Sequence, residues 1–244
     1  LKITTRQTVQ LHGLLKHQLR PTIQAFNTAK LDSIAACGDV NRNVIVSSHP
    51  QISAIHQQIY EYADKISTLL LPKTQSYYEV FIDGEKIYER SSEADPLYED
   101  RYLPRKFKIA IAIPPSNDVD VFTNDIGLIA IIENDVLKGF NIAIGGGLAT
   151  THGNPNTYSR LGSIIGFTDT EEKTLKAVYE ILTVQRDFGN RVDRKLSRLK
   201  YTVDKLTVEG FKKELDNRIG FHFEPERTYS FTEDSPPAAA RPAC

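Results

Sequence analysis

The sequence predicts an α+β fold in which mixed or antiparallel sheets are flanked by helices. Two patterns favour this class: short apolar or alternating runs that are typical of strands, and longer segments whose apolar residues recur at helical spacing. These segments follow one another without a strict strand–helix alternation, which would instead indicate a parallel α/β sheet. With 244 residues, the chain is long enough for one large domain or two small ones.

The N-terminal part is expected to hold two strands and one helix. Apolar residues separated by polar ones predict a strand over 1–12. Gly13 then leads into a helix that ends near Phe26, with Pro21 at a break or in a late first turn. A short second strand is expected over 39–46.

The next segment combines a helix with a hairpin. Residues 51–70 carry apolar side chains at helical spacing, which predicts a helix, and Pro72 ends it. Two predicted strands, 77–82 and 86–88, flank the pair Asp83-Gly84. Because Asp-Gly is a favoured hairpin turn, these strands are expected to pair with each other.

Three further strands are expected in the middle of the chain. An acidic loop containing a proline, over 91–100, precedes a strand over 107–113. Two more strands, over 127–133 and 139–144, are separated only by the turn residues Asn134-Asp135. The last two strands are therefore expected to form a second hairpin.

Helices are expected to dominate the C-terminal third. Thr168 and Glu171 fit a capping box at the start of one helix, and Gly189 suits its C-terminal cap. A last helix is expected over 207–218, followed by Gly220. The Pro- and Ala-rich end of the chain has no fold signal, so an unstructured tail is expected there.

The composition narrows the possible functions. A formal net charge of −1 excludes a uniformly basic nucleic-acid binder. The longest apolar runs are far too short to span a bilayer, so we expect no membrane partner. The two cysteines, Cys37 and Cys244, form neither a CxxC pair nor a zinc spacing, so no metal-binding residues are predicted. Cys37 is interpreted as a small buried hydrophobic residue.

The first of four polar or cationic segments lies at the N-terminus. On a single strand over 1–12, the side chains of Arg6, Thr8, Gln10 and His12 share one face. That face could present hydrogen-bond donors to a ligand rich in carboxylates. The alternative, which the pattern alone favours, is the solvent-exposed face of an edge strand.

Two further cationic segments lie on predicted strands. Arg42 is placed in a short strand where a charge needs a partner, and the alternative to a ligand is a structural ion pair with Asp or Glu. Lys106 and Lys108 are two positions apart, so their side chains point the same way. Two converging ammonium groups repel each other unless an anion lies between them, and they can also supply protons. The alternative is a solvated strand end.

The fourth segment, 185–195, is rich in arginine and lies at the end of a predicted helix. Cations are favoured there by the helix dipole, which is the alternative to a binding site. The run Gly145-Gly146-Gly147 lacks the spacing of a dinucleotide or phosphate loop. It predicts only a close backbone approach or a positive φ.

In order and spacing, these segments resemble the sulfite/nitrite reductase hemoprotein family. The resemblance extends from Leu1 to about Thr232. The matching segments are 5–13, 39–44, 102–108, 113–118, 139–148, 152–154, 185–195, 200–202 and 223–225. No single motif is decisive, but so many in the same order make a chance resemblance improbable.

The resemblance implies an oxidoreductase of sulfate assimilation in the cytoplasm. The family reduces sulfite to sulfide with six electrons at a siroheme, which a Cys thiolate bridges to a [4Fe–4S] cluster. It also implies an NADPH-dependent flavoprotein reductase subunit as electron donor. By position, Arg42, Lys106 and Lys108 match residues that bind the oxyanion and deliver protons. The residues that match siroheme contacts are Arg6, Gln10, His12, Gly145, Gly146, Gly147, Arg186, Arg194 and Lys195.

The sequence also departs from the family pattern. The four cluster cysteines of the family lie downstream of the last matching segment, and that region is absent here. We therefore expect this chain alone to be inactive. Methyl-viologen-driven sulfite reduction by a preparation with siroheme absorbance would contradict that expectation. The family pattern further implies that 1–50 is the end of a ferredoxin-like half domain, 51–232 a siroheme-binding domain and 233–244 a tail.

Two other functions stay open. A nitrite reductase of the same family would share the basic pocket, although the paired lysines favour sulfite. A non-catalytic fragment that binds siroheme or an anion is the second alternative. Comparison of kcat/KM for the two anions distinguishes the enzymes, and siroheme binding without turnover would support the fragment.

Overall fold

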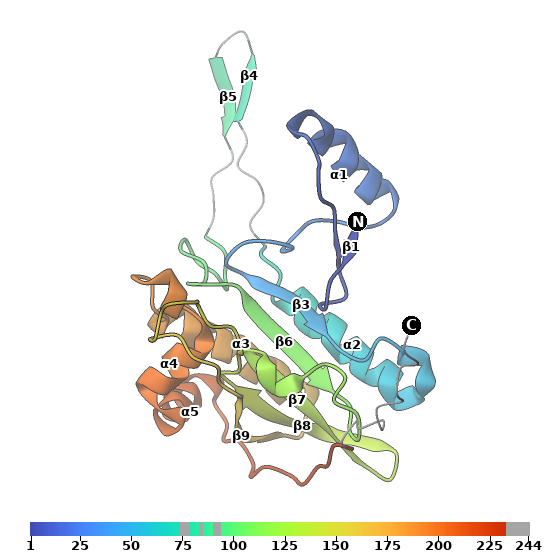
Figure 1. The fold of residues 1–244 in the computed structure, drawn as a ribbon, viewed down its shortest axis with the longest axis vertical. Helices are drawn as coiled ribbons and strands as arrows, with labels where there is room; N and C mark the ends of the chain where they lie inside the picture. Colours follow the sequence, from blue (N-terminus) through green and yellow to red (C-terminus); the bar gives the residue numbers. More distant parts are fainter. Residues whose placement is uncertain (74–78, 83–84, 90–93, 233–244) are drawn as a thin grey trace, which may run out of the picture.

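The computed structural model describes residues 1–73, 79–82, 85–89 and 94–232, and its centre is a five-stranded mixed sheet (Figure 1). In spatial order the strands are β3 (Asn41–Ile45), β6 (Phe107–Ala112), β7 (Ile126–Glu133), β8 (Val136–Ile144) and β9 (Ser163–Thr168). The first three run parallel, whereas β7, β8 and β9 pair antiparallel. This mixed sheet confirms the predicted α+β class.

Two antiparallel hairpins lie outside this sheet. They are β1 (Lys2–Ile3) with β2 (Val9–Gln10), and β4 (Glu79–Ile82) with β5 (Glu85–Glu89). The β4–β5 pair confirms the predicted hairpin, although its turn lies outside the described residues. The predicted turn between β7 and β8 is also confirmed, because Asn134 and Asp135 both have the positive φ that such a two-residue turn requires.

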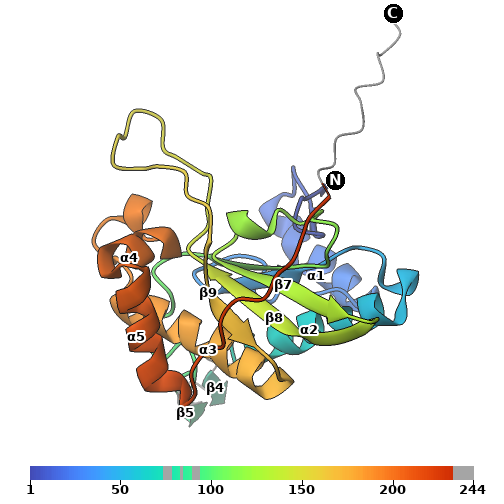
Figure 2. The ribbon, with the colours of Figure 1, turned by 90° about the horizontal axis from the view of Figure 1, so that it is seen from below.

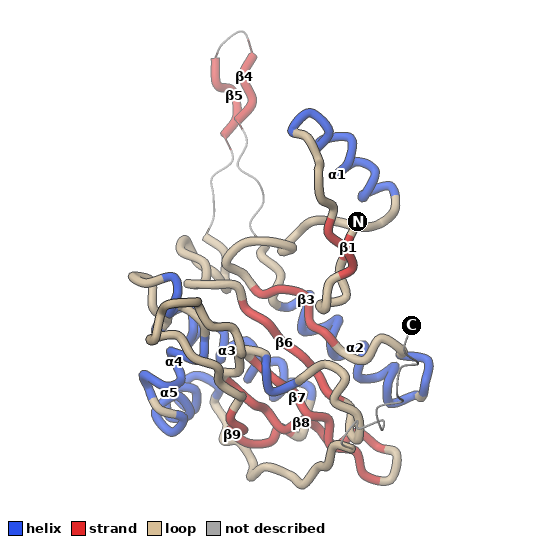
Figure 3. The backbone as a smooth tube through the Cα atoms, viewed as in Figure 1, coloured by secondary structure: helices blue, strands red, loops and turns tan. Residues whose placement is uncertain are grey.

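Two helices lie on one face of the sheet, two more pack beside them, and the N-terminal helix lies apart from the sheet (Figures 1 and 2). The described helices are α1 (Leu19–Thr28), α2 (Ala54–Leu69), α3 (Glu171–Phe188), α4 (Leu199–Leu206) and α5 (Val208–Ile219), with 3-10 turns η1 (Lys16–Gln18), η2 (Pro50–Ile52), η3 (Val121–Thr123) and η4 (Arg194–Leu196). The coloured secondary structure in Figure 3 shows α2 and α3 behind the strands. Pro21 is the third residue of α1, which confirms its place in the first turn.

The main core fills the space between this sheet face and the helices. The N-cap of helix α2 is Ser53, whose hydroxyl accepts from the His56 amide. The helix buries Ile59, Ala63 and Ile66. These residues lie three and four positions apart, as the predicted apolar face requires. They pack with side chains of α3 and of the central strands, such as Phe140.

A C-terminal strap covers the opposite face of the sheet. Residues 221–232 leave α5 and cross the strands, as Figure 2 shows. Glu224 pairs with Phe167 of β9, and Arg227 exchanges two hydrogen bonds with Asn141 of β8 (2.7 and 2.9 Å). Phe231 then packs on a second, smaller core cluster. The strap therefore shields one face and leaves the end of β6 that carries the cationic residues uncovered by it.

The prediction of one strand over 1–12 is wrong. The chain reverses between β1 and β2, with Gln7 at a φ of 56° and a hydrogen bond of 2.7 Å between the hydroxyls of Thr4 and Thr8. Arg6 thus lies in a turn, while Gln10 is in β2 and His12 follows it. The alternation of apolar residues is the same for one long strand and for two short paired ones.

The C-terminal third contains two elements that the sequence pattern did not predict. One is β9, whose last residue is Thr168, so the predicted capping box is wrong. The cap of α3 is Thr170, whose side chain accepts from the Lys173 amide. The other is α4, which ends one residue before α5 begins. Gly189 does cap α3, and Gly220 follows α5 with a left-handed φ of 76°, as predicted.

The predicted boundaries at residues 50 and 232 stay predictions. The strand β3 precedes the first boundary and pairs with β6, which follows it. Residues 233–244, including Cys244, lie outside the described residues. Within the described part of the chain, no helix combines the length and the apolar character needed to cross a membrane.

Candidate functional site

The candidate site is organised around one buried carboxylate. Asp125 directly precedes β7, and its side chain is fully buried. It accepts two hydrogen bonds from the Arg198 guanidinium (3.0 and 2.8 Å) and one from the backbone amide of Lys108 (2.9 Å). A bidentate arginine–carboxylate pair is strong and directional. Asp125 therefore joins the start of β7, the start of β6 and the N-terminus of α4.

Five cationic side chains converge near this carboxylate. Each of them acts electrostatically on at least one other, and together they form what we call the basic cluster. Its members are Arg6, Arg42, Lys106, Lys108 and Arg198. Within the described residues, Asp125 is the single carboxylate that acts on Arg6, Lys106 and Lys108. Arg105 adds a further positive charge that acts on Lys106, so the cations outnumber this one carboxylate, which favours binding of an anion.

Arg6 reaches the cluster through an irregularity in the sheet. The register between β3 and β6 shifts between Asn41 and Val44, where the regular ladder is interrupted. The Arg6 guanidinium donates to two carbonyls there, those of Asn43 (2.5 Å) and Ile109 (3.1 Å). Burial lowers the pKa of Arg6 to about 10. Its Nε is buried and has no partner among the described residues.

Arg42 is held by backbone and not by an ion pair. Its guanidinium donates to the carbonyls of Ala36 and Gly38, the latter at 3.2 Å. In the described part of the chain, no Asp or Glu forms a salt bridge with Arg42 and its buried Nε has no partner. The interpretation as a structural ion pair is therefore not supported, and the positive charge stays uncompensated at close range.

Lys106 and Lys108 extend from the start of β6 on the same side. Phe107 between them is buried in the core, so the strand directs the two lysines away from it. Neither ammonium group has a hydrogen bond or salt bridge to a described residue. Burial, Arg105 and Arg198 lower the pKa of Lys106. Burial and the charges of Arg198, Arg6 and Lys106 lower the pKa of Lys108 to about 8.

The lowered pKa of Lys108 gives the first testable prediction. Lys108 should carry its proton below about pH 8 and lose it as the pH rises through that value. Sulfate serves as the oxyanion probe because it keeps its charge over this range, and its affinity for the basic cluster should fall as Lys108 becomes neutral. NMR of the lysine side chains, with Lys108→Met to assign the signal, measures the midpoint. A midpoint near the ordinary 10.5 would contradict the crowding inferred here.

The glycine run lies beside the cluster. Gly145 has a φ of 77°, and a Cβ on Gly146 would collide with the carbonyl oxygens of Phe122 and Asn124. Both observations confirm the predicted positive φ and close backbone approach. A Cβ on Gly147 would lie 3.5 Å from Nη2 of Arg198, an ordinary contact. The run thus packs the end of β8 against the segment that carries Asp125.

Three of the residues matched to siroheme contacts lie outside the cluster. Arg186 donates to the Leu97 carbonyl (2.8 Å) and pairs with Asp187 and Glu99. Arg194 forms a bidentate pair with Asp39 (2.7 and 2.8 Å). The side chain of Lys195 is exposed. Their assignment to siroheme stays a prediction.

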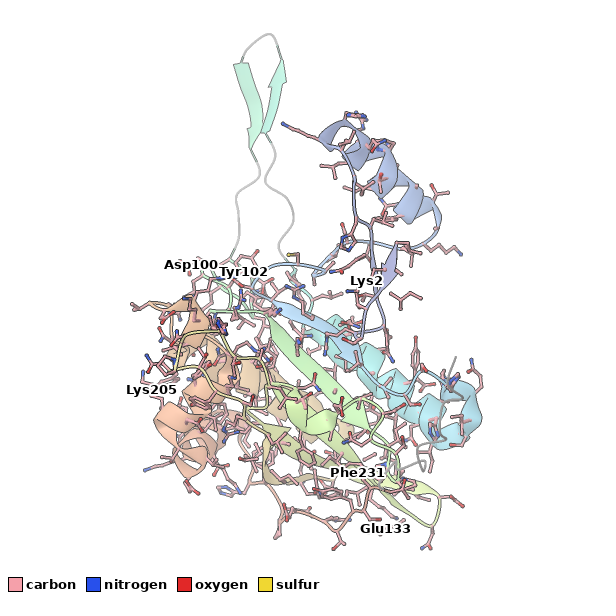
Figure 4. The ribbon with its side chains drawn as sticks, in the orientation of Figure 1. Lys2, Asp100, Tyr102, Glu133, Lys205 and Phe231 are labelled. Atoms are coloured by element: carbon pink, nitrogen blue, oxygen red, sulfur yellow. The ribbon has the colours of Figure 1, made fainter. Side chains whose placement is uncertain are left out.

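Arg194 borders a cleft of about 630 Å³ between the loops 35–40 and 101–104. Figure 4 labels Tyr102, which lines it, beside Asp100. Cys37 also lines the cleft and is exposed, so its interpretation as a buried hydrophobic residue is wrong. The arginines of this cleft already have carboxylate or carbonyl partners, such as Asp187 for Arg101 (3.1 Å).

The Arg194–Asp39 pair supports a second prediction. Because the pair is largely exposed, Arg194→Ala should leave the urea midpoint of unfolding unchanged. Arg194 lies outside the basic cluster, so the sulfate affinity of Arg194→Ala should equal that of the wild type. Arg42→Ala should lower the sulfate affinity. A loss of sulfate affinity in Arg194→Ala equal to that in Arg42→Ala would show that the cleft and the basic cluster act as one site.

Sequence reasoning missed two residues of the site: Arg198 of the basic cluster and the carboxylate Asp125 that it binds. Arg198 follows the arginine-rich segment by three positions, and Asp125 ends a stretch in which polar and apolar residues are mixed without a motif. Arg198 could have been recognised from its position at the N-terminus of α4, but the sequence pattern did not predict that helix. Gln10 and His12, which were predicted to line the ligand, are exposed. In the part of the chain that the structure describes, no group of three His, Cys, Asp or Glu residues could hold a metal ion.

Comparisons with known proteins identify the family. Residues 61–223 match the family model described as the nitrite and sulphite reductase 4Fe-4S domain. A protein of Leptospira biflexa serovar Patoc named sulfite reductase (NADPH) hemoprotein beta-component is 62% identical over 235 residues. Proteins of the same name from Staphylococcus haemolyticus and Bacillus pumilus are each 51% identical, over 231 and 232 residues.

The coverage of these matches is unequal. The alignment with the Leptospira protein spans 96% of this chain but 42% of that relative, and the corresponding values for the Staphylococcus protein are 95% and 40%. The structure of the Mycobacterium tuberculosis NirA protein superposes with a TM-score of 0.68 over 93% of this chain and 36% of that chain. At 22% sequence identity this likeness shows the fold alone. Because the family model matches most of its length, the chain belongs to the nitrite and sulphite reductase 4Fe-4S domain family.

Proposed function

We propose that the protein is part of the hemoprotein subunit of a sulfite reductase, which reduces sulfite to hydrogen sulfide in the cytoplasm. The observation that carries the proposal is the basic cluster, in which five cations surround one buried carboxylate. The names of the relatives support sulfite as the substrate and NADPH as the source of electrons. A flavoprotein reductase subunit is the proposed electron donor.

The basic cluster is suited to an oxyanion. Arg42, Lys106 and Lys108 would bind sulfite, because no carboxylate among the described residues forms an ion pair with any of them. Oxygen leaves sulfite as water, so each S–O cleavage consumes protons. A lysine with a pKa of about 8 is a better proton donor near neutral pH than an ordinary lysine. Lys108 is therefore the proposed donor, with Lys106 beside it.

The residues present also fit siroheme. Its ring carries eight carboxylates, and the two buried, unpartnered Nε atoms of Arg6 and Arg42 are donors that such groups could use. Arg6, Arg198 and the backbone at Gly147 would hold the ring, with Gln10 and His12 as further proposed contacts. When bound, siroheme would supply the iron and the electron path from a [4Fe–4S] cluster. The described residues contain no set of ligands for that cluster.

A siroheme titration tests this proposal. The chain should develop the absorbance of bound siroheme, and Arg6→Ala should weaken its binding by about tenfold or more, in line with loss of one charged hydrogen-bonding group. Arg20→Ala is the matched control, since Arg20 is exposed on α1. Equal siroheme affinity of the wild type and both variants would show that the basic cluster does not bind siroheme.

Nitrite reduction within the same family is the second candidate function. Nitrite carries one charge and sulfite up to two, so the two adjacent lysines favour sulfite. The ratio of kcat/KM values for the two anions, measured on the complete enzyme, decides between them. A complete enzyme that binds siroheme but reduces neither anion would support the third possibility, a non-catalytic binding protein.

A further inference from the structure

Lys200 is a buried ammonium group that the proposed function does not use. It lies in the first turn of α4 and is 2% exposed. Its Nζ donates to the carbonyls of Gly147 (3.1 Å), Ala149 (2.9 Å) and Tyr158, which occupies all three of its donors. Among the residues that the structure describes, no carboxylate accepts from it. The charge also faces the rings of Tyr158 and Tyr201, with centroids 5.6 and 5.0 Å away.

Two of these carbonyls, those of Ala149 and Tyr158, lie at the two ends of one loop, residues 148–159, and the third belongs to Gly147 just before it. Figure 2 shows this loop, in yellow-green, projecting from the body beside α4. At its base Gly147 and Arg160 form an antiparallel pair with two backbone hydrogen bonds (2.8 and 3.0 Å). Asp204, four residues after Lys200 on the same helix, accepts from Tyr158 Oη and Arg160 Nε. Lys200 and Asp204 therefore fasten the loop to α4.

The base of this loop touches the basic cluster. Arg198 is the N-cap of α4, two residues before Lys200. A Cβ placed on Gly147 would lie 3.5 Å from both Nη2 of Arg198 and Cδ of Lys200. The loop base thus lies against the guanidinium that binds Asp125. On the other side, Gln185 accepts from Thr202 and donates to the Ser197 carbonyl.

We propose that Lys200 is a positioning residue: by fastening the loop 148–159 to α4, it fixes Arg198 in the basic cluster. A buried ammonium without a carboxylate is costly to fold, which argues for a specific role. Gln185 holds the helix from the α3 side, whereas the Lys200 bonds hold the surface that faces Gly147. The relevance of the cluster to catalysis rests on the proposed function, whereas the positioning of Arg198 does not.

The titration of Lys108 reports the position of Arg198. Burial first and then the charge of Arg198 lower the pKa of Lys108; Arg6 and Lys106 lower it as well, and Asp125 raises it. In Lys200→Met, the midpoint of Lys108 should rise from about 8 toward the ordinary 10.5. The matched control is Lys205→Met, because Lys205 is exposed at the far end of α4 (Figure 4) and should leave the midpoint at about 8.

A second variant removes the loop and keeps the lysine. The paired residues Gly147 and Arg160 have the geometry of hairpin ends, so residues 148–159 can be replaced by Asn-Gly, which favours a two-residue turn. This variant deletes two of the three carbonyls that Lys200 binds. It should also raise the titration midpoint of Lys108. Because Lys200 keeps its charge in this variant, such a rise would come from the lost attachment of the loop to α4 alone. If Lys200→Met does not fold, this variant decides alone.

Hydrogen exchange completes the experiment. Amides of the loop 148–159 should exchange about tenfold faster or more in Lys200→Met, because the loop loses its buried anchor. Faster exchange with the Lys108 midpoint still at about 8 in both variants would overturn the proposal and leave Lys200 as a loop anchor only. None of these measurements depends on sulfite or siroheme, so a failure of the proposed function would leave this result unchanged.

Discussion

Asp125→Asn should destabilise the protein by about 3–5 kcal/mol, the usual cost of breaking a buried ion pair. The substitution keeps the size of the side chain and removes the one charge that compensates Arg198, Arg6 and Lys108. It also weakens the acceptor for the Lys108 amide, which lies 2.9 Å away. Urea unfolding followed by circular dichroism measures the change in the free energy of unfolding.

Asp118→Asn is the control for this experiment. Asp118 is exposed in the loop that precedes Asp125, so the same chemical change should alter the free energy of unfolding by less than about 0.5 kcal/mol. High salt should restore part of the stability of Asp125→Asn, because mobile anions screen the uncompensated cations. Equal stability of Asp125→Asn and the wild type would mean that the cluster tolerates its own repulsion without this carboxylate.

Replacing Lys106 and Lys108 together by Met should lower kcat/KM for sulfite by about 100-fold or more, a typical effect of losing general acid catalysis. The change removes two of the cations that bind the oxyanion and the group with a pKa of about 8. Both side chains point away from the core side of the strand, where Phe107 is buried, so the fold should persist. Steady-state kinetics of the complete enzyme with reduced methyl viologen measure this effect.

The single variants separate binding from proton delivery. Lys106→Met should mainly raise KM, whereas Lys108→Met should mainly lower kcat and remove the limb of the pH profile near 8. The control is the double variant Lys205→Met and Lys213→Met, which removes two exposed lysines and should leave both constants unchanged. An unchanged kcat/KM in the Lys106 and Lys108 double variant would exclude the lysines from the reaction.

The sequence predicted most elements whose pattern is local. The β7–β8 hairpin could be read from its turn pair, and α2 from its apolar spacing. The reversal between β1 and β2 could not, because alternating residues fit one strand or two. The helix α4 was missed because its apolar face is short and includes the buried Lys200, which resembles a solvent-exposed residue in sequence.

In the candidate site, too, the sequence predicted what depends on local pattern and missed what depends on tertiary packing. Lys106 and Lys108 could be placed together because two residues on a strand share a side. Their proximity to Arg42 could be expected only from the family resemblance, since it depends on the parallel pairing of β3 and β6. The role of Asp125 could not be found at all, because a buried carboxylate becomes informative only when its partners, such as Arg198, are placed.

The most direct test of the central claim is the titration of Lys108 in the presence of sulfite. If the basic cluster is an oxyanion site, a bound sulfite stabilises the charged lysine. The midpoint should rise above about 8 as sulfite saturates the protein, and Arg42→Ala should require more sulfite for the same rise. A midpoint that stays at about 8 at every sulfite concentration would contradict the account.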